Sequence, residues 1–337
     1  MTDWHPALHG HWHAVALARD IARRPVAVSL LGVHLALART DAGEWIALED
    51  RCPHRQAPLS AGCVDGEKIS CPYHGWSFDH SGRLCAVPGL PDEAALPKVG
   101  VRAFAACERD GIIWVRPGDA GEVQPNALVE LADASTRRLS WRTRLQANVV
   151  DAMENMLDPV HTHFVHPGLV RREGRRASVT ATYTANRDGF QVDFESDAPQ
   201  SGLLYRLFES RRTLERAHFA TPGSIRLEYG YANGSRITFD LHFTPITTEE
   251  TDVFACVHVA GRWAPAWAVR LLAGPLLRRV VEQDARILKL QADNRRRFGP
   301  RQGASTSLDI VRPAIEHFWS FGALPDGDEQ RVVEMRL

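Results

Sequence analysis

Short runs of alternating apolar and polar residues, separated by glycine, proline and aspartate, occupy the first third of the chain, from about residue 12 to 117. Runs of this kind are typical of β-strands joined by tight turns. Residues 26–50 predict two antiparallel strands, because Asp41, Ala42 and Gly43 give a hairpin-turn signal between two apolar stretches. The pattern therefore predicts a compact all-β unit, built on the runs PVAVSLLG, HLALART, EWIALED, GWSFDHSGRLCAV and RDGIIWVRPG.

A second series of alternating runs begins beyond a segment of weak periodicity. RPGDAGEVQPN (residues 116–126) carries glycine and proline without a strong pattern, and it marks the predicted boundary between domains 1–118 and 119–337. A helix is predicted over about residues 144–165, followed by an antiparallel sheet with one buried face. The strand runs are SVTATYTAN, GFQVDFES, SIRLEYGYA, RITFDLHFT and TDVFACVHVAG.

Two helices are predicted to close the chain. The second spans about residues 307–320 and includes His317 and Trp319. The first spans about residues 274–298 and has an apolar stripe at helical spacing, which contains the carboxylate of Asp284. The stripe consists of Leu277, Val280, Val281, Asp284, Ile287, Leu288 and Gln291. The predicted fold class is therefore α+β, with an all-β N-terminal domain, a large antiparallel sheet and C-terminal helices.

Composition excludes several classes of protein. The chain has 337 residues, of which 44% are apolar and 24% charged, and its net charge of -1 gives no basis for binding nucleic acid or an anionic membrane. Arg23 and Arg24 precede an apolar stretch and mimic a twin-arginine export signal, but His34 interrupts a stretch already too short to span a membrane. A cytoplasmic protein is expected.

Two short motifs each supply one cysteine and one histidine. Cys52-x-His54 is followed, after 16 residues, by Cys71-x-x-His74. Tetrahedral zinc would accept these four ligands. The mixed pairing better suits a [2Fe-2S] cluster, in which one iron takes both thiolates and the other takes both imidazoles. Thiolate ligands also fit a reducing compartment better than a disulfide scaffold does.

The residues around these ligands favour the iron–sulfur interpretation. Pro53, Pro72, Gly75 and Trp76 predict tight, rigid loops that direct backbone N–H groups at the sulfurs. The stretch resembles the Rieske signature, C-x-H followed by C-P-x-H-G-W. The resemblance implies a Rieske-type cluster whose ligands are Cys52, His54, Cys71 and His74.

A second cluster of candidate ligands lies in NMLDPVHTHFVHP, which contains three histidines. Non-heme iron oxygenases bind Fe(II) through two histidines and one carboxylate. Helical spacing alone selects His163 and His166, because residues three apart share a helix face. Pro159 and Pro167 break the helix, however, so His161 and His166 can also converge. Spacing leaves both pairs open.

The same segment resembles the catalytic motif N-x-x-D-x-x-H-x(4)-H of the terminal (alpha) component of Rieske non-heme iron oxygenases. The motif maps onto Asn155, Asp158, His161 and His166. The resemblance implies that His161 and His166 bind Fe(II), with His163 beside the ligands or in the pocket.

The third ligand implied by the resemblance is Asp284. Its context, EQDARILKLQ, is similar to the family's E-D-x(6)-Q helix, with Gln283 in place of the usual acid. A buried, unpaired carboxylate is costly, and ferrous iron is a suitable partner for it. The alternative is an aspartate at the edge of the stripe, paired with Arg279 or Arg286.

In the family, the residue that matches Asp158 links two metal sites across a subunit boundary. The resemblance implies that Asp158 accepts hydrogen bonds from His74 of one subunit and His161 of the next. Closed head-to-tail contacts of this kind produce rings. A homotrimer is therefore expected.

The function implied is that of a terminal oxygenase, which uses O2 and electrons from a separate NAD(P)H-dependent reductase or ferredoxin. The form of the chain resembles the branch of vanillate O-demethylase and dicamba monooxygenase. This branch implies monooxygenation, by hydroxylation or by O- or N-demethylation, of a small aromatic substrate. Two alternatives remain: a cis-dihydroxylating dioxygenase of aromatic rings, and an electron-transfer iron–sulfur protein with a non-catalytic second domain.

Two groups of residues carry weaker predictions. RREGRR (171–176) is interpreted as a solvated loop, or as a site that docks an acidic ferredoxin-like partner or steers an anionic substrate. Apolar residues of the second domain are candidates for the pocket or for the core, because alternation does not say which face meets the iron. They are Phe194, Leu204, Phe208, Phe239 and Trp263.

Overall fold

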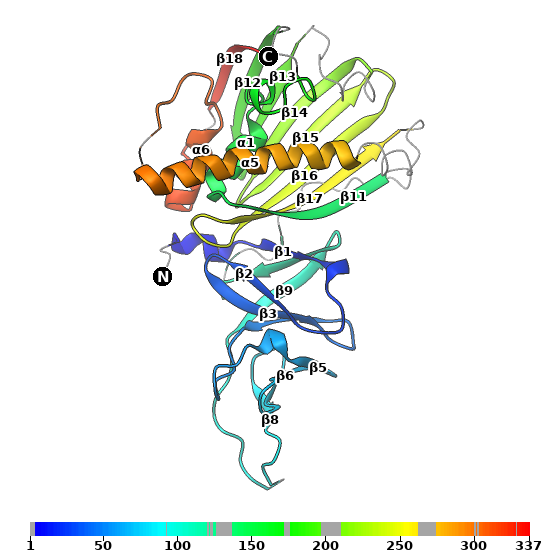
Figure 1. Cartoon of the computed structure of the whole chain (residues 1–337), viewed down its shortest axis with the longest axis vertical. Helices are drawn as coiled ribbons and strands as arrows, with labels where there is room; N and C mark the ends of the chain where they lie inside the picture. Colours follow the sequence, from blue (N-terminus) through cyan, green and yellow to red (C-terminus); the bar gives the residue numbers. More distant parts are fainter. Residues whose placement is uncertain are drawn as a thin grey trace. The chain divides into compact units, whose positions relative to one another are not determined.

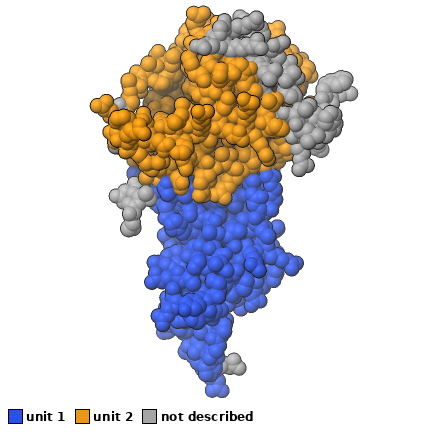
Figure 2. Space-filling model, viewed as in Figure 1, with its two compact units in different colours: residues 1–125, 244–247 blue, residues 126–243, 248–337 orange. Residues whose placement is uncertain are grey.

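The computed structural model divides the chain into two compact units. One contains residues 1–125 and 244–247, and the other contains residues 126–243 and 248–337 (Figure 2). The structure describes residues 4–91, 93–119, 121, 124–125, 137–171, 176–196, 210–261, 274–299, 301, 303–327 and 329–337.

The first unit is built from two antiparallel sheets. Among the described residues, one sheet has the strand order β1-β10-β9-β4-β3-β2 and the other has the order β5-β6-β7-β8. Short 3-10 helices span Pro6–Gly10, Ala18–Asp20 and Leu59–Ala61. The strands are His13–Leu17 (β1), Val26–Leu30 (β2), Val33–Arg39 (β3), Trp45–Glu49 (β4), Cys63–Asp65 (β5), Lys68–Ser70 (β6), Ser77–Phe78 (β7), Leu84–Ala86 (β8), Ala103–Arg109 (β9) and Ile112–Arg116 (β10).

Residues 26–50 form three strands, so the prediction of two was wrong. The apolar run breaks at Leu31 and Gly32, whose φ angles of 49° and 75° reverse the chain between β2 and β3. An apolar residue in this conformation is uncommon, and no polar turn signal marks the position. The second turn, at Asp41–Gly43, joins β3 to β4 where the sequence predicted it.

The hydrophobic core of the first unit extends to both cysteines of the predicted cluster. Cys52 and Cys71 are buried and belong to a cluster of apolar side chains drawn from both sheets. Close packing of this kind fixes the positions of side chains that border it. The other buried members of the cluster are Ala36, Ala38, Ile46, Leu48, Leu59, Ile69, Phe78, Leu84 and Val101.

The second unit contains an eight-stranded antiparallel sheet with helices, in agreement with the predicted α+β class (Figure 1). Within the described residues the strand order is β11-β17-β16-β15-β14-β13-β12-β18. The strands are Arg137–Leu145 (β11), Ser178–Asn186 (β12), Gly189–Glu195 (β13), Arg212–Ala220 (β14), Ser224–Tyr231 (β15), Arg236–Pro245 (β16), Thr251–Ala260 (β17) and Gln330–Arg336 (β18). The helices are Val149–Leu157 (α1), Thr162–Val165 (α2), Gly274–Phe298 (α5) and Arg312–Phe321 (α6).

Helix α5 runs across one face of this sheet (Figure 1). Alternation along β16 turns Ile237, Phe239 and Leu241 toward a cavity that Leu277 and Val281 of α5 also line. The predicted apolar stripe of α5 thus faces the sheet. Ile287, at the margin of the stripe, is instead 41% exposed.

The helix predicted over residues 144–165 is divided into two helices. Strand β11 continues to Leu145, α1 ends at Leu157, and the single turn of α2 begins at Thr162. Asp158 has φ -81° and ψ 114°, the extended conformation that the ring of Pro159 imposes on the residue before it. None of the helices in the described residues is both long and apolar enough to span a bilayer.

Candidate functional site

The first cysteine–histidine loop is a tight turn closed by its own backbone. The Cys52 amide donates to the Ala57 carbonyl at 2.9 Å, and the Gln56 amide donates to the Cys52 carbonyl at 2.8 Å. Gln56 has φ 61°, a left-handed conformation. The turn thus fixes the backbone that carries Cys52 and His54.

The second loop repeats the same turn. The Cys71 amide donates to the Trp76 carbonyl at 2.8 Å, and the Gly75 amide donates to the Cys71 carbonyl at 3.1 Å. Gly75 has φ 70°, and a Cβ at this position would lie 2.8 Å from Pro88 Cγ. Glycine is therefore required by both torsion and space.

The four predicted cluster ligands are arranged as a thiol pair and an imidazole pair. The rings of His54 and His74 lie 4.6 Å apart between centroids, and Trp76 stacks on His54 at 4.7 Å. Burial, together with the neighbouring Cys71 thiol, raises the pKa of Cys52. A buried thiolate pair needs a cation, so this donor set fits a [2Fe-2S] cluster with two cysteines on one iron and two histidines on the other.

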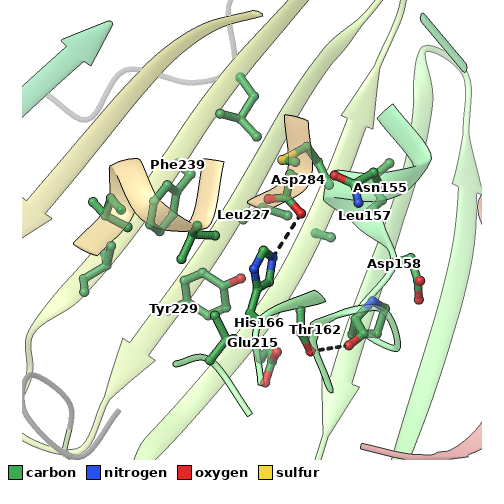
Figure 3. Close-up of a pocket in the computed structure, with 18 of the residues that line it drawn as sticks. Asn155, Leu157, Asp158, Thr162, His166, Glu215, Leu227, Tyr229, Phe239 and Asp284 are labelled. Atoms are coloured by element: carbon green, nitrogen blue, oxygen red, sulfur yellow. Dashed lines mark hydrogen bonds and ion pairs between the residues drawn. The ribbon is translucent and has the colours of Figure 1, made fainter. Parts of the chain in front are cut away.

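The second candidate metal site is assembled from α5 and from the segment around α2. Ligand atoms of His161, His166 and Asp284 all lie within 4.8 Å of one another. Asp284 Oδ1 is 3.0 Å from His166 Nε2 and 3.5 Å from His161 Nε2 (Figure 3). This oxygen is buried, yet no hydrogen bond of regular geometry to a described residue reaches it. The three atoms converge as ligands of one ion do.

The break between α1 and α2 positions His161. The Asp158 carboxylate accepts hydrogen bonds from the backbone amides of Val160 (2.7 Å) and His161 (3.1 Å). These bonds cap the turn that leads into α2, as aspartate commonly does at a helix start. As a result, His161 and His166, which are five residues apart, both approach Asp284.

An oxygen atom lies within hydrogen-bond distance of Nδ1 in each of the two histidine rings and orients the ring. His161 Nδ1 is 2.5 Å from the Asp158 carbonyl, and His166 Nδ1 is 2.9 Å from Gln283 Oε1. An oxygen acceptor at Nδ1 places the proton there, so Nε2 is left to bind a metal. Gln283 thus makes, with an amide, the contact for which the family motif has an acid.

The charge balance of the site favours a cation. Burial raises the pKa of Asp284, but the two imidazoles outweigh it, so the net pKa is lowered. Burial lowers the pKa of His166, but Asp284 outweighs it and the net pKa is raised. Arg279 and Arg286, the alternative partners of Asp284, are exposed. Two imidazoles and one ionised carboxylate fit Fe(II) with open positions.

The candidate iron site opens into a cavity of about 270 Å³. Phe194 and Phe239 line it, whereas Leu204, Phe208 and Trp263 lie outside the described residues. Its apolar wall also includes Trp141, Leu227, Val257, Val259, Leu277 and Val280. The cavity is therefore apolar over most of its surface, and the three candidate ligands belong to the same site.

Two family models match consecutive parts of the chain. The model of the Rieske [2Fe-2S] domain matches residues 11–104, and that of the vanillate O-demethylase oxygenase C-terminal domain matches residues 145–312. The chain belongs to the Rieske non-heme iron oxygenases.

Among curated relatives of this Rieske oxygenase is the putative toluene-4-sulfonate monooxygenase system iron-sulfur subunit TsaM2 of Comamonas testosteroni. It is 39% identical over 162 residues, 46% of this chain and 45% of that protein. The dicamba O-demethylase oxygenase component of Stenotrophomonas maltophilia is 34% identical over 158 residues, 46% of each chain. The matched segments thus span about half the length of these relatives.

Solved structures share the fold over nearly the whole chain. Dicamba monooxygenase bound to dicamba superposes with a TM-score of 0.77 and 20% identity, over 93% of this chain and 96% of that one. The order of a β unit followed by an eight-stranded sheet with helices is therefore the fold of this family.

The other predicted site residues lie in or near the cavity of the Rieske oxygenase. Asn155 and Asp158 line the cavity, and the Asp158 carboxylate is 3.8 Å from His161 Nδ1. His163 is buried but does not belong to the cluster of three ligands, so the pair selected by helical spacing is not the pair that meets Asp284.

Charged residues of the cavity were missed at the level of sequence. The stretch that begins at Arg171 was interpreted as a solvated loop, or as a site that docks a partner or steers an anionic substrate; Arg171 is buried and lines the cavity, so the solvated loop is wrong for this residue. Arg212, Glu215 and Arg216 line it too, and all three belong to β14, which was not predicted as a strand. The consecutive charges of Glu215 and Arg216 hid the alternation of this strand. Residues 172–175 of the basic stretch lie outside the described residues.

Proposed function

We propose that this chain is a terminal oxygenase component that transfers oxygen from O2 to a small aromatic substrate, by hydroxylation or by O- or N-demethylation. The observation that carries the proposal is the convergence of His161, His166 and Asp284 beside an apolar cavity of about 270 Å³. A cavity of this size lies just below the usual range for small-molecule sites, which begins at about 300 Å³.

Monooxygenation is the favoured outcome. The names of relatives matched over part of the chain describe a monooxygenase system and an O-demethylase. The C-terminal family model is likewise that of an O-demethylase oxygenase. A cis-dihydroxylating activity uses the same ligand set, so it is the second candidate.

Each predicted site residue has a stated role in this proposal. Cys52, His54, Cys71 and His74 hold the cluster, and the second site, at His161, His166 and Asp284, holds Fe(II). When bound, the cluster supplies single electrons and the ferrous ion supplies activation of O2.

The chain itself supplies orientation and shape. Asp158 fixes the turn that carries His161 and also orients its ring through the main chain. Asn155 places a side-chain amide in the same cavity, where it can position the bound substrate.

The assembly expected for this function is a homotrimer with a separate NAD(P)H-dependent reductase or ferredoxin as electron donor. The Asp158 side chain is 33% exposed, and the His74 imidazole is also exposed. Because both side chains are at least partly exposed, the carboxylate and the imidazole can meet across a subunit boundary, as the family resemblance implies. The cytoplasmic location stays a prediction.

Iron analysis and oxygen uptake test the proposal together. The purified chain is expected to hold about three irons, two in the cluster and one at the second site. His161→Ala should remove about one iron per chain, whereas the matched variant His163→Ala should keep all of them.

With a surrogate reductase, O2 uptake should depend on an aromatic substrate, and the product should gain one oxygen or lose a methyl group. About two irons in the unaltered protein would indicate an electron carrier instead. A product that gains two oxygens and two hydrogens would establish the dioxygenase.

A further inference from the structure

A cluster of buried charges lies in the cavity of the candidate iron site. Arg171 and Arg212 have side chains that are 5% and 9% exposed, and both approach Glu215. Arg212 Nη1 is 2.8 Å from Glu215 Oε2, a full ion pair. Arg171 Nη2 is 3.6 Å from Glu215 Oε1, which is longer than a hydrogen bond. All three residues line the cavity, and Figure 3 labels Glu215 in it together with His166 and Asp284.

The turn after α2 ties Arg171 to the metal site. The amides of Leu169 and Val170 donate to the carbonyl of His166 at 3.1 and 3.2 Å. Gly168 then donates to the Arg171 carbonyl at 2.7 Å, and its φ of 74° closes the turn. The guanidinium of Arg171 is therefore held at a fixed place relative to a candidate iron ligand.

A β-bulge brings Arg212 to the same face as Glu215. Arg212 pairs with Tyr231 and Glu215 pairs with Tyr229, so one extra residue lies between them on β14. Tyr229 and Tyr231 are two apart on β15 and share a face, and cross-strand partners lie on the same side of a sheet. The Arg212 guanidinium also lies over the Tyr229 ring, 4.4 Å from its centroid.

Among the described residues, two guanidinium groups of this cluster approach one carboxylate. Arg171 and Arg212 both lie near Glu215. Arg216, the next residue along β14, pairs instead with Asp193 at 2.5 Å. Arg171 Nε is buried and has no hydrogen-bond partner among the described residues. A buried cation that is only partly neutralised is costly unless a bound anion completes the site.

We propose that this cluster binds an anionic group of the substrate, a carboxylate or a sulfonate on the aromatic ring, with Arg171 as its main contact. The planar guanidinium matches two oxygens of such a group. The apolar wall takes the ring, and the anchored anion presents the opposite end of the ring to the iron site. This inference rests on the proposed function and names the class of substrate.

Equilibrium binding of matched probes tests it without turnover. Isothermal titration of the anaerobic holo-protein compares 4-methoxybenzoate and 4-methoxybenzenesulfonate with the neutral isostere 4-methoxybenzamide. At least one of the acids should bind about 10- to 100-fold more tightly than the amide, as expected for hydrogen bonds to a charged group. Arg171→Gln should remove this preference and leave the affinity for the amide nearly unchanged.

Two further variants separate the contact from general effects. Arg171→Lys keeps the charge but loses the planar fork, so it should retain only part of the preference. Arg176→Gln is the matched control, since Arg176 ends the same basic stretch and is exposed, with its guanidinium 5.0 Å from the Phe164 ring centroid. It should bind both acids like the unaltered protein.

Three results would overturn the inference: equal binding of acids and amide, no millimolar binding of either acid, or an unchanged preference in a folded Arg171→Gln variant. Each leaves the proposed function standing if substrate-dependent O2 uptake is found. Conversely, acid-selective binding without any O2 uptake would contradict the proposed function and keep the anion site.

Discussion

Gln283 is the residue at which this site departs most clearly from the family motif. Its side-chain oxygen is 2.9 Å from His166 Nδ1, where the motif has an acid. A carboxylate in this position would make the imidazole a stronger donor to the metal, whereas an amide orients the ring without adding charge. The orientation of His166 therefore depends on one neutral hydrogen bond.

Replacing Gln283 with leucine should weaken binding of Fe(II) at the second site by about 10- to 100-fold, because His166 loses the described residue that accepts a hydrogen bond from Nδ1. Competition with a chelator, monitored by iron analysis, measures this. Gln283→Glu should bind iron at least as tightly as the unaltered chain. Gln291→Leu, at an exposed position of the same helix, is the control. Unchanged affinity in Gln283→Leu would mean that the ring is oriented by packing.

At the scale of elements, the buried carboxylate of Asp151 links helix α1, which leads into the metal site, to helices α5 and α6. Asp151 of α1 contacts Arg295 of α5 at 2.5 Å and Arg312 of α6 at 3.1 Å. Asn148 caps α1 by accepting from the Asp151 amide at 2.9 Å. Because α1 ends where Asp158 begins the ligand turn and α5 carries Asp284, these contacts set the spacing of the ligands.

Asp151→Ala should lower the free energy of unfolding by about 2–4 kcal/mol, because it leaves two partly buried arginines without their shared carboxylate. Urea unfolding, followed by the fluorescence of tryptophan, measures the change. The matched variant Asp293→Ala breaks exposed pairs with Lys289, at 2.7 Å, and Arg296, at 3.1 Å, and should cost less than about 1 kcal/mol. Equal effects of the two variants would show that the buried pairs contribute no more than a surface pair.

The elements that sequence predicted well are those with an uninterrupted pattern. Helix α5 has the predicted bounds, strands β12, β13, β15 and β17 lie within the predicted runs, and β16 extends one residue beyond its run. Strand β14 was missed because Glu215 and Arg216 interrupt its alternation, and those charges belong to the cavity. Strands β11 and β18 were missed because edge strands are rich in charged residues.

The sequence motifs identified the site residues that lie close together in the sequence or at a fixed spacing. Arg171 and Glu215 are far apart along the chain and have no motif, so only the fold brings them together. The choice between His161 and His163 also depended on the helix break, because regular helical spacing favours the wrong partner for Asp284.

At the scale of the whole molecule, one chain contains two candidate metal sites in two separately folded units. The family resemblance implies that the cluster of one subunit serves the iron of its neighbour. Nothing in a single sequence fixes how many copies assemble, since this depends on the match between two surfaces.

Mixed oligomers test this arrangement. His54→Ala should inactivate the cluster and Asp284→Ala the iron site, so each variant alone should be inactive, while oligomers that contain both should regain turnover. Adding Asp158→Asn to the His54→Ala chain, which keeps its iron site, should abolish this rescue. Adding it to the Asp284→Ala chain should not. Turnover absent from every mixture, with both metals present, would place the electron path within one subunit.

The bulge in β14 decides on which face of the sheet Arg212 lies. Side chains along a regular strand alternate between faces, so Arg212 and Glu215, which are three residues apart, would point to opposite faces without it. If the bulge moved to the other side of Arg212, its guanidinium would turn away from Glu215, although no amino acid would have been exchanged. The position of a bulge, as well as substitution, is thus a route by which such enzymes can diverge in the substrates they accept.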